Sequence, residues 1–163
     1  QPGDLKAIDA VYYCCGPGST LSLRLAAAFV KTLLWEAKGR ISLFQYNALD
    51  LAACMTKESI NSIQAPFRMG KRFVRTGKVR AIGQKNVLLE EDALEKYPQS
   101  LHLLGPRAIA IEIPEAQILK YDLNSVNGLT DLNLVSETAE QPAPYSPEPM
   151  TFKKWEGVIP AKK

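Results

Sequence analysis

Apolar and polar positions alternate in short blocks over the first third of the chain, and the blocks predict regular elements. A nearly continuous apolar run at residues 7–15, followed by glycine and proline, predicts a strand buried on both faces. Residues 20–37 are apolar on most sides and predict a helix that must be covered by its own sheet and by something else. Residues 41–46 predict a second strand and residues 48–57 a second helix, capped by Asn47. This order predicts an α/β fold with a parallel pair of strands.

The pattern changes after residue 57. Residues 62–83 alternate apolar and basic side chains around Met69-Gly70, which predicts a β-hairpin that exposes one charged face. The other predicted elements are a short acidic helix at 89–97, strands at 101–105 and 109–113, and a helical segment at 114–123. Five prolines after residue 141 exclude regular structure from most of the C-terminal tail.

Composition narrows the class of protein. The chain has 163 residues, 46% of them hydrophobic and 23% charged, which suits one compact domain or two small lobes sharing a cleft. The net charge of +3 is too small to indicate nucleic-acid binding by itself. Three cysteines, two of them adjacent, favour reduced thiols, and neither a membrane-spanning stretch nor a signal peptide is recognisable. We therefore expect a cytoplasmic protein, and a chain that starts at Gln1 and enters a strand almost at once is expected to be cut from a longer one.

The turn between the first strand and the first helix is a candidate anion site. Its residues Gly16, Gly18 and Ser19 precede a helix N-terminus, where free N–H groups and the helix dipole favour phosphate. The loop is neither a Walker A motif nor GxGxxG, because no Lys-Ser or Lys-Thr pair follows the glycines. By spacing alone, a tight turn that joins strand to helix is favoured over phosphate binding.

The run at residues 9–24 resembles the hallmark of the TsaB (YeaZ-like) family, in which a strand leads into GPGSFTGLRIG and a helix. The positions that match are Gly16, Pro17, Gly18, Ser19, Leu23 and Arg24. The positions that depart are Thr20, Leu21 and Ser22 in place of Phe-Thr-Gly, and Leu25-Ala26 in place of Ile-Gly.

Later segments resemble the same family in the same order, although only the first third is specific. SLFQYNALDLAA at 42–53 is similar to its second strand and helix, APFRMGKRFV at 65–74 to its "DARMGEVY" hairpin, LLGP at 103–106 to "l.GpGa", and Pro144-Tyr145 to its C-terminal "PxYlR". The family also has a strand containing "IDTS", a hairpin and a first helix upstream of the GPGS strand. This chain has only a short polar stretch before Lys6, so it resembles the family without that N-terminal segment.

The resemblance implies an actin-like ATPase (ribonuclease-H-like) fold. It divides the chain into the remainder of a first lobe at 1–58, a smaller second lobe at 59–140 that holds the basic hairpin, and a Pro-rich tail at 141–163. It also implies a non-catalytic partner of a TsaD-like subunit, which modifies the adenosine beside the tRNA anticodon with a TsaE-like ATPase as third component.

In that family the helix after GPGS packs against equivalent helices of TsaD or of a second copy. The implied interface residues are Thr20, Leu23, Arg24, Ala27, Ala28 and Lys31. The helix is also nearly as well explained as a central core helix. Without its first helix, the chain is alternatively a diverged homologue with another binding role.

Catalysis is difficult to build from this sequence. His102 is the only histidine, so a two-histidine metal site cannot form within the chain, and no histidine lies near Ser19 in sequence to act as its base. We expect no catalytic residue, no metal and no cofactor. The alternative from another class is a small phosphate- or nucleotide-binding enzyme that uses the Gly16–Thr20 loop.

The hairpin supplies a candidate tRNA-facing basic patch. Its residues are Arg68, Lys71, Arg72, Arg75 and Lys78. Such a patch could neutralise phosphates, and an exposed basic edge that discourages strand pairing is the modestly favoured alternative. Any contact with tRNA is expected to be indirect.

Overall fold

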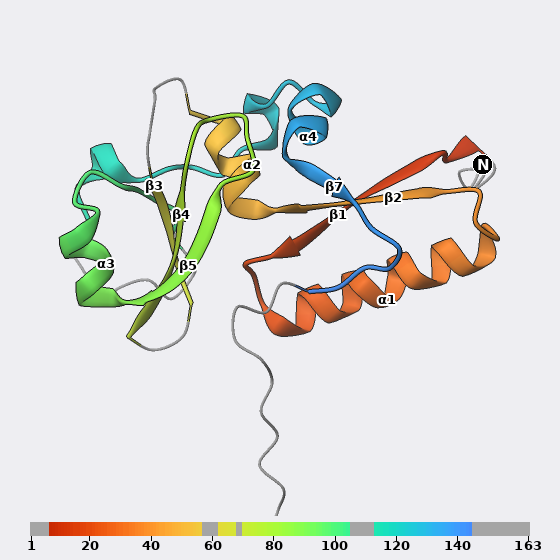
Figure 1. Cartoon of the computed structure of the whole chain (residues 1–163), viewed down its shortest axis with the longest axis horizontal. Helices are drawn as coiled ribbons and strands as arrows, with labels where there is room; N and C mark the ends of the chain where they lie inside the picture. Colours follow the sequence, from red (N-terminus) through yellow and green to blue (C-terminus); the bar gives the residue numbers. More distant parts are fainter. Residues whose placement is uncertain (1–6, 57–61, 68–69, 105–112, 145–163) are drawn as a thin grey trace, which may run out of the picture.

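The chain forms two small sheets that meet at a short helix (Figure 1). The computed structural model describes residues 7–56, 62–67, 70–104 and 113–144. Within these ranges the class is mixed α/β, as the order of apolar blocks predicts.

The first sheet has the strand order β1-β2-β7. β1 (Ala10–Gly16) pairs in parallel with β2 (Ser42–Asn47), so the predicted parallel pair is confirmed. α1 (Thr20–Glu36) is the crossover between them. β7 (Ser136–Thr138) pairs antiparallel with the other edge of β2.

α1 covers one face of this sheet. Ala27, Val30 and Leu33 are the buried residues of the helix, and the first two pack with Tyr13 and Leu43 of the strands. Residues three apart face the same side of a helix, so the three define its inner face. The opposite face of the sheet is only partly covered, which corrects the expectation that β1 is buried on both faces.

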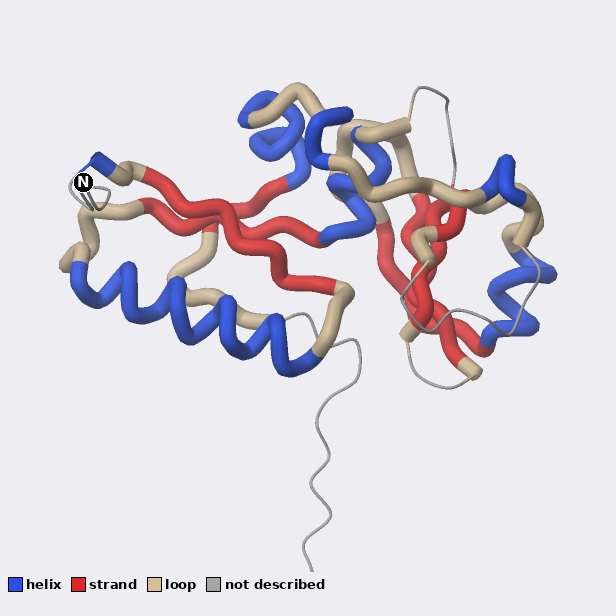
Figure 2. The backbone as a smooth tube through the Cα atoms, turned by 180° about the vertical axis from the view of Figure 1, so that it is seen from behind, coloured by secondary structure: helices blue, strands red, loops and turns tan. Residues whose placement is uncertain are grey.

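α2 (Ala48–Cys54) lies where the two sheets meet (Figures 1 and 2). The Asn47 side chain accepts a hydrogen bond from the Leu49 N–H at 3.0 Å, which is the predicted cap. One side of the helix packs on the second sheet through Leu49, Ala52 and Ala53. The other side packs through Leu51 and Cys54 against α4 (Leu129–Val135). Since α2 is covered on both sides, it belongs to the core of both halves.

The second sheet has the order β5-β4-β3-β6. Its strands and helix are β3 (Ser62–Pro66), β4 (Lys71–Thr76), β5 (Gln84–Leu89), β6 (Leu101–His102) and α3 (Glu90–Lys96). The predicted hairpin is present as the antiparallel pair β3–β4, and the acidic helix is present as α3. β5 was not predicted, because its first half, Gln-Lys-Asn, has no apolar alternation.

The C-terminal part of the chain returns to the first sheet, which corrects the predicted lobe boundary at residue 140. α4 contacts α2 and β2, and β7 extends the first sheet, so residues 129–138 belong with the first lobe. β2 and β7 pair although their residues are about ninety positions apart in the chain. The local pattern of apolar residues does not predict pairing over such a distance.

Three further predictions differ from the structure or lie outside it. The strand predicted at 101–105 is reduced to Leu101–His102, and the helical segment at 114–123 contains only the 3-10 turns Glu115–Gln117 and Leu123–Ser125. Of the strand predicted at 109–113 only Ile113 is described, and it is not in a strand. Residues 141–144 have no regular structure, as predicted for the tail, and the rest of the tail lies outside the described residues. Over the described part of the chain, no helix has the length and apolarity to cross a bilayer.

Candidate interaction surface

The outer side of α1 carries a row of large apolar side chains. Leu21, Leu25 and Phe29 are 67%, 62% and 69% exposed, and their spacing of four residues places them on one side of the helix. Ala28 and Thr32 lie among them and are also exposed. We call these five residues the α1 outer face. Figures 1 and 2 show the first sheet on one side of α1, and the exposure of these five residues places them on the side away from it.

The amino-acid composition of α1 explains why apolar side chains remain exposed on this face. α1 is apolar on most sides, but a sheet can cover only one of them, here the side of Ala27 and Val30. The core-helix interpretation, in which all sides are covered, therefore does not hold for the described residues. A row of exposed large apolar side chains on a soluble protein typically marks a binding surface.

The interface residues inferred from the family resemblance fall on different sides of α1. Thr20, Arg24, Ala28 and Lys31 are exposed, and Arg24 and Lys31 lie seven residues apart on one flank of the α1 outer face. Leu23 is partly buried, and its carbonyl oxygen accepts a hydrogen bond from the Tyr13 hydroxyl at 3.2 Å.

Ala27 is a correction to that set. It is only 6% exposed and packs against the sheet, so its side chain cannot meet a partner, and an arginine there would disrupt the core. The exposed anchors are instead Leu21, Leu25 and Phe29. Their i, i+4, i+8 spacing is visible in the sequence, but the same spacing also describes a core-facing stripe.

The Gly16–Thr20 loop has the geometry of a tight turn. Gly16 has φ 124°, a left-handed conformation that side chains rarely adopt, so the turn itself accounts for glycine there. Gly18 and Ser19 are exposed, and Ser19 precedes the helix without making a side-chain capping bond. The loop therefore stays a candidate for anion binding on sequence grounds alone.

The predicted basic patch is largely internal. Arg72 is 2% exposed and Arg75 is fully buried, so neither guanidinium is available to a phosphate. Lys78 is exposed, Lys71 is partly buried, and Arg68 lies outside the described residues. The alternation of basic and apolar residues predicted that the hairpin exposes a charged face. Instead, α2, α3 and the loop after β4 cover the second sheet and supply oxygen atoms that accept hydrogen bonds from Arg72 and Arg75.

Arg75 is held by a carboxylate and by three carbonyl groups. Its Nε donates to Asp50 Oδ1 at 3.0 Å, and its terminal nitrogens donate to the carbonyl oxygens of Gly77, Lys78 and Ala81 at 2.6 to 3.0 Å. The loop after β4 therefore wraps around the guanidinium. A buried charge is tolerated when its hydrogen bonds are satisfied in this way.

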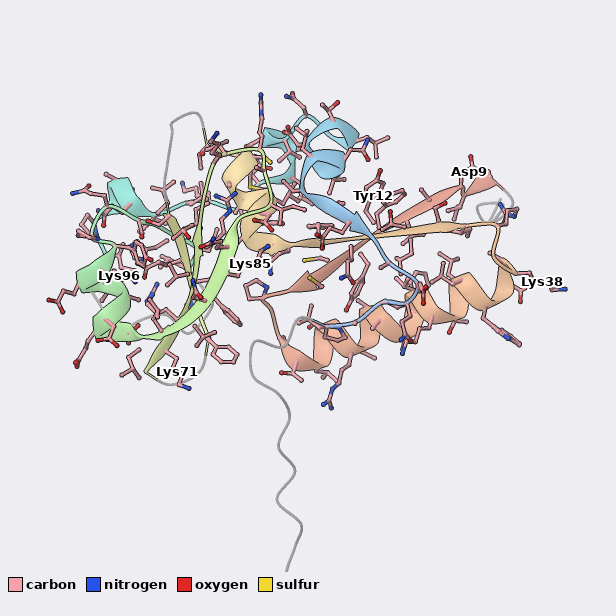
Figure 3. All side chains as sticks on the ribbon, viewed as in Figure 1. Asp9, Tyr12, Lys38, Lys71, Lys85 and Lys96 are labelled. Carbon is pink, nitrogen blue, oxygen red and sulfur yellow. The ribbon has the colours of Figure 1, made fainter. Side chains whose placement is uncertain are left out.

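Asp50 connects α2 to the second sheet. It is 1% exposed and accepts hydrogen bonds from Arg75 and from the Gly83 N–H at 2.8 Å, while Lys85 Nζ lies 2.6 Å from its second oxygen. Figure 3 shows Lys85 between the two sheets. Because α2 also packs on the first sheet, this junction cluster of Asp50, Arg75, Gly83 and Lys85 helps to fix one sheet relative to the other.

His102 lies in a second buried polar cluster. Arg72 Nη2 is 3.1 Å from His102 Nδ1, and Arg72 Nη1 donates to Glu90 Oε1 at 2.9 Å. Burial, with a smaller contribution from the Arg72 charge, lowers the pKa of His102 to about 4. The imidazole is therefore neutral at pH 7 and accepts a hydrogen bond from Arg72.

This pKa makes stability depend on pH. Since the pKa of His102 is lowered from 6.5 to about 4 on folding, the stabilising effect is complete above pH 6.5 and is lost as pH falls toward 4. We expect the unfolding free energy of the protein to decrease by about 2–3 kcal/mol more between pH 7 and 4.5 than that of a His102→Gln variant. Urea unfolding of both proteins at the two pH values measures this difference. Parallel pH dependences would contradict a neutral buried imidazole.

Two of the three thiols, those of Cys15 and Cys54, are buried, and that of Cys14 is partly buried. All three are free, and burial raises the pKa of Cys15 to about 11. A thiol with such a pKa is protonated at neutral pH and is a poor nucleophile. In the described ranges, no three His, Cys, Asp or Glu side chains are grouped so that they could hold a metal ion.

Comparisons with known proteins find a likeness in structure but none in sequence. No protein-family model and no curated protein matches the sequence. Among solved structures, the chain is similar to YeaZ from Pseudomonas aeruginosa, with a TM-score of 0.42 and 19% identical residues. The alignment covers 69% of this chain and 50% of that one, so the chain spans half the length of the structure it matches.

Proposed function

We propose that this chain is a non-catalytic partner subunit of the tRNA threonylcarbamoyladenosine modification machinery, and that it pairs with a TsaD-like subunit through the α1 outer face. The exposure of Leu21, Leu25 and Phe29 on one side of α1 is the observation that carries the proposal. It supports a binding role on physical grounds. The identity of the partner comes from the resemblance of the strand–GPGS–helix segment to the TsaB family.

The α1 outer face is suited to helix–helix contact. The small residues Ala28 and Thr32 lie beside its three large side chains and leave room for a facing helix to interdigitate. The inner face of α1 is anchored on the sheet by Ala27, Val30 and Leu33, so the outer face is held in place before a partner arrives. Such preorganisation lowers the entropic cost of association.

Two basic residues beside the apolar row would favour one orientation of a bound partner. Arg24 and Lys31 lie on the same side of the row of apolar residues and are exposed. A partner helix with acidic residues on the matching edge would be favoured in one orientation over the reverse. Charged rims of this kind affect association rate and specificity more than affinity.

The proposal excludes catalysis by this chain. Its only histidine is buried against Arg72 and therefore is poorly placed to act as a general base for Ser19. The raised pKa of Cys15 makes that thiol a poor nucleophile. Chemistry, metal and nucleotide are assigned to the TsaD-like and TsaE-like subunits, and no cofactor is assigned here.

Co-purification with a TsaD-like subunit from the same organism tests the proposal. The two proteins are mixed, separated by size exclusion and sized by light scattering, with a TsaE-like ATPase added in a second run. A one-to-one complex is the expected result. Two separate peaks would reject pairing with TsaD, and a self-dimer alone would assign the α1 outer face to a second copy of this chain.

A further inference from the structure

The described chain ends beside α1. After β7, the Ala139 N–H donates to the Leu43 carbonyl oxygen at 3.0 Å, and Ala139 packs against the cluster that contains Ala27 and Val30. Pro142 is buried. Figures 1 and 2 show from opposite sides that the segment after β7 runs along α1. Pro144 therefore leaves the remaining chain next to the helix whose outer face is uncovered.

The remaining residues, 145–163, contain a concentration of large apolar side chains. Met150, Phe152 and Trp155 fall within six positions of one another in a segment that also has four lysines. Six residues of extended chain reach about 20 Å, whereas the distance along α1 from Leu21 to Phe29 is about 12 Å. The stretch that carries these three apolar residues is thus long enough to span the row from Leu21 to Phe29.

We propose that the C-terminal segment 145–163 binds in cis to the α1 outer face and shields Leu21, Leu25 and Phe29 from water. Three large apolar side chains on the segment meet three on the helix, and the connection through Pro144 gives them a high effective concentration. A short tether makes an intramolecular contact favourable even when the free segment binds weakly.

The contact would make the segment a competitor of the partner subunit, a consequence that rests on the proposed function. A partner helix must displace residues 150–155 before it contacts α1. The affinity of the partner is then reduced by the fraction of chains whose outer face is free. The segment would keep the isolated chain from associating nonspecifically and would yield to a partner with better complementarity.

Tryptophan fluorescence tests the cis contact in the full-length protein. The chain has two tryptophans, and Trp35 is 79% exposed, so a Trp35→Phe variant reports on Trp155 alone. In that background Trp155 is expected to be protected from acrylamide quenching, at all protein concentrations. Adding Leu25→Asp should shift its emission to the red and raise the quenching constant to that of a free 145–163 peptide.

Leu129→Asp is the matched control, since Leu129 is 63% exposed on α4, on the opposite side of the first sheet. It should leave the fluorescence of Trp155 unchanged. Quenching of Trp155 as strong as in the free peptide before any α1 substitution would overturn the proposal. Protection that appears only at high protein concentration would overturn binding in cis.

A second measurement separates this inference from the proposed function. In a full-length Phe152→Ser, Trp155→Ser variant, affinity for the TsaD-like subunit should increase by about tenfold. Unchanged affinity together with a protected Trp155 in the parent would overturn the competition. If neither protein binds TsaD, the proposed function fails, whereas the fluorescence result still decides the cis contact.

Discussion

Replacing Asp50 with alanine is expected to lower the free energy of unfolding by about 3–5 kcal/mol, since it leaves a buried charge without its counterion. Arg75, fully buried, would lose its carboxylate partner, and the Gly83 N–H and the Lys85 ammonium would lose theirs. Because Asp50 lies on α2, the loss of these interactions would weaken the junction of the two sheets. Urea or thermal unfolding followed by circular dichroism measures the effect.

Asp9→Ala is the matched control, because Asp9 is exposed at the far end of the first sheet (Figure 3). Its free energy of unfolding should change by less than about 0.5 kcal/mol. Replacing Asp50 and Arg75 together, with Arg75→Met, should cost less than the sum of the single substitutions because no unpaired charge then remains from this pair. A loss for Asp50→Ala no greater than that of the control would show that the cluster does not hold the sheets together.

Substituting Phe29 with aspartate is expected to weaken binding to the TsaD-like subunit by about 100-fold or more, the size of effect found at interface hot spots. Phe29 is 69% exposed and is one of the three large apolar side chains of the α1 outer face, so the change puts a charge within the proposed contact. The free chain should stay folded, with a stability change within about 0.5 kcal/mol. Titration calorimetry gives the affinity and thermal unfolding gives the stability.

Leu129→Asp is the matched control for Phe29→Asp. Leu129 is similarly exposed but lies on α4, away from α1. It should bind the partner as the parent chain does. Equal loss of affinity in both variants would indicate a general effect of added charge, and unchanged affinity for Phe29→Asp would remove α1 from the interface.

Ala27 and Ala28 illustrate why the interface could be inferred only in part. They are adjacent in a run of three alanines, and both were inferred to be interface residues. The structure buries Ala27 at 6% exposure and leaves Ala28 exposed. A helix that is apolar all round carries no periodic signal for which side meets its own sheet, so the assignment depends on the contacts with β1 and β2.

Local sequence determined the first half of the fold. Apolar runs, the Gly-Pro turn and the Asn47 cap were sufficient for β1, α1, β2 and α2 in their observed order, and the parallel pairing of β1 and β2 follows from that order. These features depend on residues that are neighbours in the chain. The assignment to an actin-like fold and the role beside TsaD stay predictions from the family resemblance.

Tertiary structure alone decided where the charges and the last strand lie. Arg75 looks in the sequence like one more member of an exposed basic hairpin, yet it is buried because Asp50, twenty-five positions earlier, meets it across the junction. β7 joins β2 for a similar reason, through partners far apart in the chain. Local periodicity reports which side of an element is apolar, whereas the partner that covers that side, or neutralises a charge on it, is set by long-range packing.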